Sequence, residues 1–250
     1  MARLHRSCPP GYSQHVIQRG NNRAPCFGDD ADRYQYMEWL TEYAQEFAVA
    51  VHAWVLMTNH VHLLATPSTD GGLSRLMQCL GRRYVRYFNK TCQRTGTLWE
   101  GRFKSCVVQG VHYALRCHVY IEMNPVRAGM VSKPGEYQHS SYRCHAAGGS
   151  HVLWTPHPEY LALGADQAQR LESYQRLLSA RSAADAQQIR DATHKGLALG
   201  TAQFKNPLEQ LHHRRLRPAT LGRPKIVHLT PIAGLKKLPE ATLIYACRRP

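Results

Sequence analysis

Two histidines, His60 and His62, stand two residues apart at the start of the apolar stretch HVHLLAT. Side chains of a strand alternate between its two faces, so both imidazoles would leave the same face and could form half of a metal site. The pair alone is weak evidence, because 15 His in 250 residues give about one such pair by chance. Two polar residues on a strand are the alternative interpretation unless other residues support a metal.

Tyr120 and Asn124, in the stretch HVYIEMNPVRAG, are a second candidate pair. Residues four apart share one face of a helix. A tyrosine can accept a phosphoryl group where a metal polarises the phosphate and nearby cations favour the phenolate. An amide oxygen is a suitable ligand for a hard cation such as Mg²⁺ or Mn²⁺. Because Pro125 follows, Asn124 could instead cap a backbone carbonyl at a frayed helix end.

The hydrophobic pattern predicts the elements that must position these side chains. Alternating or continuously apolar runs predict strands at 12–20, 49–57, 60–66 and 102–109. Apolar residues at helical spacing predict helices at 29–47, 72–89 and 112–124, the last one stopped by Pro125. The second and third strands flank a short Thr58-Asn59 turn and form a hairpin. We therefore expect an α+β fold, an antiparallel sheet with helices on one face.

The charge of the chain indicates a polyanionic partner. The net charge is +15, which favours nucleic acid over a membrane surface. No apolar run approaches the ~18 residues of a membrane span, and the first residues do not resemble a signal peptide. Eight Cys without a Cys-x-x-Cys pair indicate reduced thiols in a cytoplasmic protein and argue against a zinc ribbon.

The segment from Arg75 to Lys104 contains basic residues interspersed with aromatic residues. This segment holds eight Lys/Arg against one acid, Glu100, a composition suited to phosphates and stacked bases. Aromatic residues at helical spacing are also typical of a core, and that is our preferred interpretation of the rings. The residues expected to contact nucleic acid are Arg19, Arg23, Arg82, Arg83, Arg86, Arg102, Lys104, Arg223 and Lys225.

The composition changes near residue 150. The stretch 157–193 is rich in Ala, Gln and Leu and is expected to be helical. From Lys195 onward, 11 Lys/Arg face only Glu209 and Glu240. We expect a catalytic domain at 1–150 and a helical, basic extension at 151–250 that contacts DNA.

Four sequence blocks occur in a fixed order: HVIQRGNNRAPCF, HAWVLMTNHVHLL, GTLWEGRFKS and YIEMNPVRAGMV. Together they resemble the REP-associated tyrosine transposases, relatives of the single-tyrosine insertion-sequence transposases in the HUH nuclease superfamily. The resemblance covers roughly residues 12–145. The later stretches IRDATHKGLALGTAQF and GRPK are similar to a C-terminal extension of some members. The first block departs from the family pattern after QRGNNR, which bears on the base preference of that segment.

The resemblance implies a role for each candidate residue. His60 and His62 correspond to the HUH metal ligands, Tyr120 to the nucleophile and Asn124 to a third ligand of one Mg²⁺ or Mn²⁺ ion. The implied fold is ferredoxin-like. The implied activity is metal-dependent cleavage and strand transfer of single-stranded DNA at hairpin-forming, REP-like repeats, through a 5′-phosphotyrosine. The expected setting is the bacterial cytoplasm at the nucleoid, without a membrane, and action as a monomer or a homodimer is left open.

Two other functions remain in view. A relaxase or replication initiator also combines His-x-His with Tyr, but the four ordered blocks argue against it. A catalytically silent DNA- or RNA-binding regulator derived from a transposase would share the basic sheet-and-helix domain. Such a regulator would tolerate loss of Tyr120, whereas this sequence keeps all four candidate catalytic positions.

Overall fold

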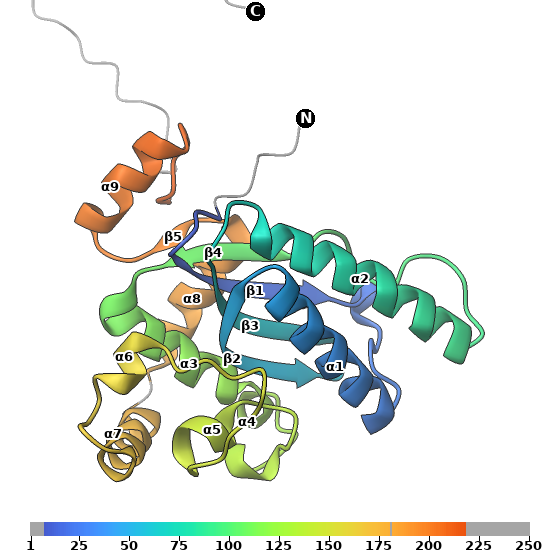
Figure 1. The fold of residues 1–250 in the computed structure, drawn as a ribbon, viewed down its shortest axis with the longest axis horizontal. Coiled ribbons are helices and arrows are strands. Elements are labelled where there is room, and N and C mark those ends of the chain that lie inside the picture. The colour runs from blue at the N-terminus through green and yellow to red at the C-terminus, as the bar shows by residue number, and fades with distance from the viewer. Residues whose placement is uncertain (1–7, 181, 219–250) are drawn as a thin grey trace, which may run out of the picture. The chain divides into compact units, whose positions relative to one another are not determined.

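The computed structural model describes residues 8–180 and 182–218 (Figure 1). Its first six main elements are β1 (Ser13–Arg19), α1 (Asp30–Glu46), β2 (Val49–Met57), β3 (His60–Pro67), α2 (Gly72–Thr91) and β4 (Lys104–Val108). The sheet has the strand order β2-β3-β1-β4-β5, and its first four strands are antiparallel neighbours. This β-α-β-β-α-β order with the strand sequence 2-3-1-4 is the ferredoxin-like arrangement. The α+β, antiparallel fold expected from the sequence is confirmed.

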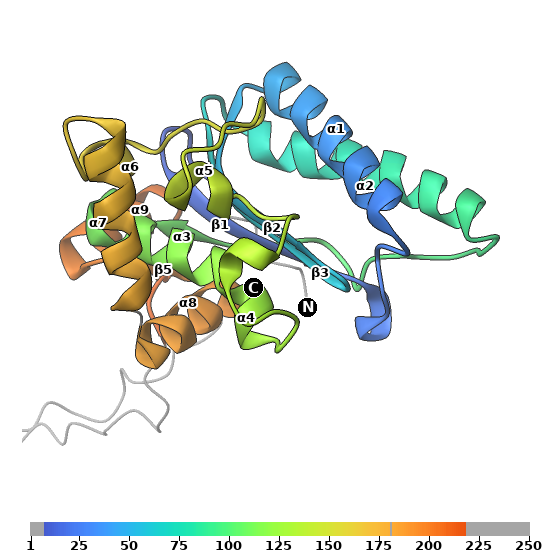
Figure 2. The same cartoon turned by 90° about the horizontal axis from the view of Figure 1, so that it is seen from below.

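Helices α1 and α2 cover one face of this sheet (Figure 2). The Asp29 side chain caps α1 by accepting a hydrogen bond from the Asp32 backbone N–H at 3.0 Å. Buried residues at helical spacing on the two helices, among them Tyr36, Leu40 and Tyr84, pack against the sheet side chains Val61 and Leu63. The rings of α2 that are buried, such as Tyr84, therefore belong to the core, as the pattern indicated.

Helices α3 (Leu115–Glu122) and α8 (Ala183–Lys195) cover the opposite face, so the expectation of helices on one face only was wrong. Because alternate residues of β3 point to opposite faces, His60, His62 and Leu64 lie on this second face. The hairpin turn between β2 and β3 thus places the two histidines at the start of β3, toward α3. Figure 1 shows α3 and α8 behind the sheet, on the side away from α1 and α2.

The remaining elements lie outside these two layers or extend the sheet. They are η1 (Asn21–Arg23), η2 (Gly110–Ala114), α4 (Asn124–Arg127), η3 (Pro134–Glu136), α5 (Tyr142–Ala146), α6 (Pro158–Leu161), α7 (Gln167–Ser179), β5 (Ala198–Leu199) and α9 (Ala202–Leu211). Strand β5 was not predicted; it pairs in parallel with β4. Within the described residues, segments beyond 150 thus pack on the sheet through β5 and α8.

The helix predicted at 112–124 is wrong in its bounds. Val111 is extended and His112 has a φ of 61°, so regular helix begins only at Leu115. The chain leaves helical geometry again at Met123, whose ψ is 0°. Pro125 is not what ends the helix. It lies in the first turn of α4, where the backbone N–H that proline lacks would have no hydrogen-bond partner within the helix.

Candidate active site

His60 and His62 are neighbours on the sheet face that α3 covers, with ring centroids 5.0 Å apart. Across the strands, His60 pairs with Arg19 and His62 pairs with Ile17. Burial lowers the pKa of His60 to about 4, with a further contribution from Arg19. Burial lowers the pKa of His62 well below its usual value, assisted by the neighbouring His15 and His60. Both rings are therefore neutral at pH 7, the state in which imidazole binds a metal.

The hydrogen bond of His60 fixes which of its nitrogens carries the proton. His60 Nδ1 lies 2.6 Å from Asn59 Oδ1, while Asn59 Nδ2 donates to the Arg23 carbonyl at 3.0 Å. The Asn59 amide is thereby oriented with its oxygen toward the ring, so Nδ1–H of His60 donates. The remaining nitrogen, Nε2, keeps its lone pair for another ligand.

The turn after β1 holds Asn59 in this position. The Gly20 N–H donates to the Asn59 carbonyl at 2.9 Å. A Cβ at Gly20 would lie 2.3 Å from the Ala24 carbonyl oxygen, so no other residue fits without moving the turn. The block QRGNNR therefore supports the histidine half of the candidate site through Asn59 and His60.

Tyr120 of α3 lies against the histidines. Its ring makes edge-to-face contacts with His62 and His15, at centroid distances of 5.6 and 5.5 Å. Burial raises the pKa of the Tyr120 phenol, whereas the cations of Arg127 and Arg190 act in the opposite direction. Two residues that are 58 positions apart in the sequence, His62 and Tyr120, thus meet in one buried site.

Asn124 lies four residues after Tyr120, at the start of α4. Its side-chain Nδ2 donates to the carbonyls of Tyr120 and Ile121, at 3.1 and 3.2 Å. This is the capping interaction that the sequence left open for Asn124. Within the described part of the chain, Oδ1 makes no hydrogen bond, so the same residue keeps an oxygen for a ligand.

The donor set fits a divalent ion with mixed nitrogen and oxygen ligands. The described residues contain no cluster of three His, Cys, Asp or Glu side chains that could hold a metal. The candidate donors are Nε2 of His60, Nε2 of His62 and the amide oxygen of Asn124, because the remaining nitrogen of each side chain is hydrogen-bonded. Such a site is suited to Mn²⁺ or Mg²⁺ and lacks the closed ligand set of structural zinc.

Two further residues of the site, His15 and Thr193, were missed by the sequence analysis. His15 Nε2 lies 2.9 Å from His62 Nδ1, and His15 Nδ1 lies 2.6 Å from Thr193 Oγ1. His15 could have been found, because it precedes Ile17 by two residues and so shares its face of β1. Thr193 lies 178 residues from His15 and has no comparable pattern around it.

A basic cleft of about 390 Å³ opens beside the site. Its lining includes Ile17 and Arg19 of β1 and Thr193 of α8, which connects it to the histidines. The basic residues of its lining are Arg19, Arg102, Lys104, His194, Lys195 and Arg214, with Glu100 as the one acid. Three predicted nucleic-acid contacts, Arg19, Arg102 and Lys104, are thus brought together.

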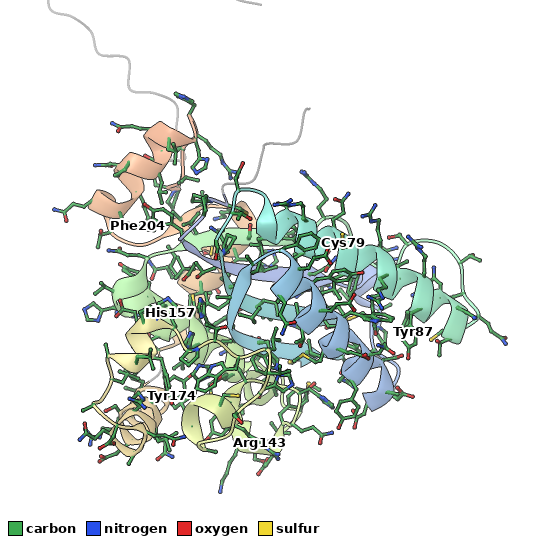
Figure 3. All side chains as sticks on the ribbon, in the orientation of Figure 1. Cys79, Tyr87, Arg143, His157, Tyr174 and Phe204 are labelled. Atoms are coloured by element: carbon green, nitrogen blue, oxygen red, sulfur yellow. The ribbon has the colours of Figure 1, made fainter. Side chains whose placement is uncertain are left out.

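The other predicted contacts lie elsewhere. Arg82 and Arg86 are exposed on α2, a helix whose side chains are seen around the labels Cys79 and Tyr87 in Figure 3. Arg83 pairs with Glu42 at 2.7 Å and lies over the Trp39 ring at 4.6 Å, so its charge is used between α1 and α2. Arg23 is exposed in the turn after β1, and Arg223 and Lys225 lie outside the described residues.

The ferredoxin-like sheet brings His62 and Tyr120 into contact, and the sequence of this part of the chain is similar to that of transposases. The sequence model of the family described as IS200-like transposases matches residues 10–124, which include every residue of the candidate set. Residues 10–124 of this chain are thus similar to that family, in agreement with the resemblance found in the sequence blocks. No helix in the described part of the chain is long and apolar enough to cross a membrane.

Solved structures with a similar fold include two transposases. One is a REP-associated tyrosine transposase bound to a REP hairpin, with 18% identity, 62% of this chain and 92% of that chain covered, and a TM-score of 0.48. The other is described as a transposase of Deinococcus radiodurans, with 15% identity, 52% of this chain and 92% of that chain covered, and a TM-score of 0.34. No curated protein matches the chain significantly.

Proposed function

We propose that this protein is a metal-dependent endonuclease and strand transferase for single-stranded DNA, with Tyr120 as its nucleophile. The observation that carries the proposal is the contact of the Tyr120 ring with His62, at a centroid distance of 5.6 Å. Tyr120 lies beside His62 and His15, near the cations of Arg127 and Arg190 and the amide of Asn124. A nucleophile and a candidate metal site within contact distance are what transfer of a phosphodiester requires.

The covalent step balances without an external energy source. The Tyr120 oxygen, having lost its proton to solvent, forms a bond to the scissile phosphorus, and the bond from phosphorus to the 3′ oxygen breaks. The products are a 5′-phosphotyrosine and a free 3′-hydroxyl. An incoming 3′-hydroxyl can reverse the step and join a new strand, because the ester energy is kept in the covalent link. Arg127 and Arg190 assist by favouring the phenolate.

We assign three side chains as ligands of the metal. His60 and His62 would bind through Nε2, and Asn124 through Oδ1. When bound, a divalent ion withdraws charge from the phosphate under attack. Asn124 has a second task, because its Nδ2 holds the end of α3 and thereby the backbone of Tyr120.

The substrate is proposed to be single-stranded DNA with hairpins of the REP type. The four ordered sequence blocks support this choice, as does the net charge of +15. The basic cleft beside Arg19 offers a path for the strand that leaves the active site. Residues 1–150 would form the catalytic domain, and the extension at 151–250 would add phosphate contacts.

One experiment tests the proposal directly. The full chain is incubated with Mn²⁺ and hairpin-bearing single-stranded DNA labelled at its 3′ end, and the products are run under denaturing conditions. We expect label to remain attached to the protein, since a 5′-phosphotyrosine retains the 3′ fragment. A 5′-labelled substrate should give a released fragment instead. Hairpin binding without any adduct would favour the silent DNA- or RNA-binding regulator and would contradict the enzyme.

A further inference from the structure

We propose that Thr193, acting through His15, holds His62 in the one ring tautomer that can bind a metal. The inference deepens the proposed function and rests on the assignment of His62 as a metal ligand. It gives a task to α8, a helix that lies beyond residues 10–124, the segment matched by the family. Thr193 and His15 are positioning residues here, because neither would touch the metal.

Three side chains form a continuous hydrogen-bonded row from α8 to the site. Thr193 Oγ1 lies 2.6 Å from His15 Nδ1, and His15 Nε2 lies 2.9 Å from His62 Nδ1. The two imidazole rings are parallel, with an interplanar angle of 0° and ring centroids 5.1 Å apart. All three residues are at most 2% exposed, so water does not compete for these hydrogen bonds.

The other contacts of Thr193 set the direction of the row. Its hydroxyl has one proton, and this proton is donated to the Ile189 carbonyl, 2.8 Å away, which can only accept. Toward His15 the Thr193 oxygen is therefore an acceptor. Cys106 Sγ, 3.3 Å from the same oxygen, is compatible with this arrangement because a hydroxyl oxygen has two lone pairs.

The proton positions of the two rings follow from that direction. Nδ1 of His15 carries the proton that Thr193 accepts, and a neutral imidazole has only one, so Nε2 of His15 is an acceptor. Nδ1–H of His62 then donates to it. The remaining nitrogen of His62, Nε2, is left with a lone pair for a metal. If Thr193 donated its proton to His15 instead, Nε2 of His62 would carry a proton and could not bind a metal.

His60 reaches the same state by a different route. Its Nδ1–H donates to Asn59, whose amide is oriented by the Arg23 carbonyl. Both histidines thus present Nε2, one held by the turn after β1 and the other by α8. Partners of this kind typically change metal affinity by about 10- to 100-fold.

The test measures the tautomer and the metal affinity without DNA. Nitrogen chemical shifts of the imidazole rings distinguish a protonated nitrogen from one with a lone pair, and they are recorded on the metal-free full chain. The variant Thr193→Val removes the hydroxyl at nearly constant volume, and Thr193→Ser restores it. Cys106→Ala is the matched control, because it removes the other side chain bonded to Thr193 and leaves the row intact.

We expect His62 to have Nδ1 protonated in the unchanged chain, in Thr193→Ser and in Cys106→Ala. In Thr193→Val the two tautomers should mix, and the Kd for Mn²⁺ should rise by about twofold or more, because only the fraction with a lone pair on Nε2 binds. A proton on Nε2 of His62 in the unchanged chain would overturn the proposal, whether or not any variant folds. An unchanged Kd in a folded Thr193→Val would overturn it as well.

The outcome is separable from that of the proposed function. If the chain binds no Mn²⁺ at all, the proposed metal site is wrong, yet the nitrogen shifts still show whether Thr193 and His15 set the tautomer of His62. If Mn²⁺ binds and His62 has the wrong tautomer, the row fails while the metal site stands.

Discussion

The guanidinium carbon of Arg127 lies 4.3 Å from the centre of the Tyr120 ring, and its Nη2 donates to the Tyr120 carbonyl at 2.6 Å. A cation over the ring stabilises the phenolate, so Arg127→Gln should raise the pKa of Tyr120. We expect adduct formation to slow by about tenfold at pH 7.5 and its pH profile to move upward, as expected for a pKa rise of about one unit.

A matched control exists for this variant. Arg116 lies over the Tyr113 ring at 5.4 Å, so Arg116→Gln removes the same kind of contact from another tyrosine. That variant should leave the pH profile unchanged. Equal effects of the two substitutions would show that Arg127 acts through general charge and not through Tyr120.

Tyr120→Phe keeps the ring contacts with His15 and His62 and removes only the nucleophilic oxygen. Hairpin binding should stay within about twofold, since no DNA-binding cation is changed, while cleavage and the covalent adduct disappear. Tyr113→Phe, in η2 seven residues earlier, should keep both activities. An adduct that persists in Tyr120→Phe would move the nucleophile elsewhere, with Tyr113 as the first alternative.

Asn124 is predicted to affect stability as well as metal affinity. Asn124→Ala loses two hydrogen bonds to the end of α3 and should lower the free energy of unfolding by about 1 kcal/mol. Asn124→Asp should lower it further, because an acceptor-only carboxylate would face the same two carbonyl oxygens.

Chemical denaturation of the metal-free variants measures this order directly. In a Mn²⁺ titration, Asn124→Ala should then show weaker binding than the unchanged chain. If Asn124→Asp proves more stable than Asn124→Ala, the capping role of Nδ2 is wrong. If the Mn²⁺ affinity of Asn124→Ala is unchanged, Asn124 is a cap and not a ligand.

Acid should destabilise the fold through His52. This buried ring donates to the Thr155 carbonyl and accepts from Thr66, both at 2.8 Å, and burial lowers its pKa to about 4. In the unfolded chain its pKa is about 6.5. As the pH falls from 6.5 to 4, the unfolded state binds a proton and the folded state does not, so stability falls, by about 2 to 3 kcal/mol from this residue.

The measurement is the free energy of unfolding between pH 7 and pH 4. His52→Gln should flatten this dependence, whereas His112→Asn, at an exposed position with a φ of 61°, should not. His157, labelled in Figure 3, is buried nearby, and its pKa is also lowered to about 4, so it acts in the same direction. A pH dependence that is equal in all variants would contradict the role of His52.

The basic cleft and helix α2 offer DNA two different surfaces, and salt dependence distinguishes them. Removing Arg102 and Lys195 from the cleft, both to Ala, should reduce the slope of log K against log salt by about 1.4 on single-stranded DNA. The double variant of Arg82 and Arg86 removes the same charge from α2 and should change the slope less. The reverse order would place the strand on α2.

Much of the fold could be predicted because its causes are local. Apolar alternation defined the strands, and helical spacing defined α1 and α2 to within two residues. The start of α3 could not be predicted, because it depends on the left-handed φ of His112, which the helical pattern does not reveal. The boundary expected near residue 150 stays a prediction.

The site shows the same division. His60 and His62 lie on one face because side chains alternate along a strand, so their spacing in the sequence was enough to predict it. Asn124 was left with two interpretations: the structure shows its Nδ2 capping α3, and its role as a metal ligand stays a prediction. The place of Thr193 in the site could not be predicted, because it depends on the packing of α8 against β4, two segments that are distant in the chain.

That distance has a consequence for the order in which the protein becomes active. The hydrogen bond between His15 and Thr193 closes a loop of 178 residues, and contacts between remote segments form late in folding. On the ribosome, both histidines and Tyr120 emerge well before Thr193. An unfinished chain thus carries the nucleophile but lacks the hydroxyl that orients His62. Under the proposed function, the chain would reach its full affinity for the metal only after Thr193 of α8 has been synthesised and has packed against His15.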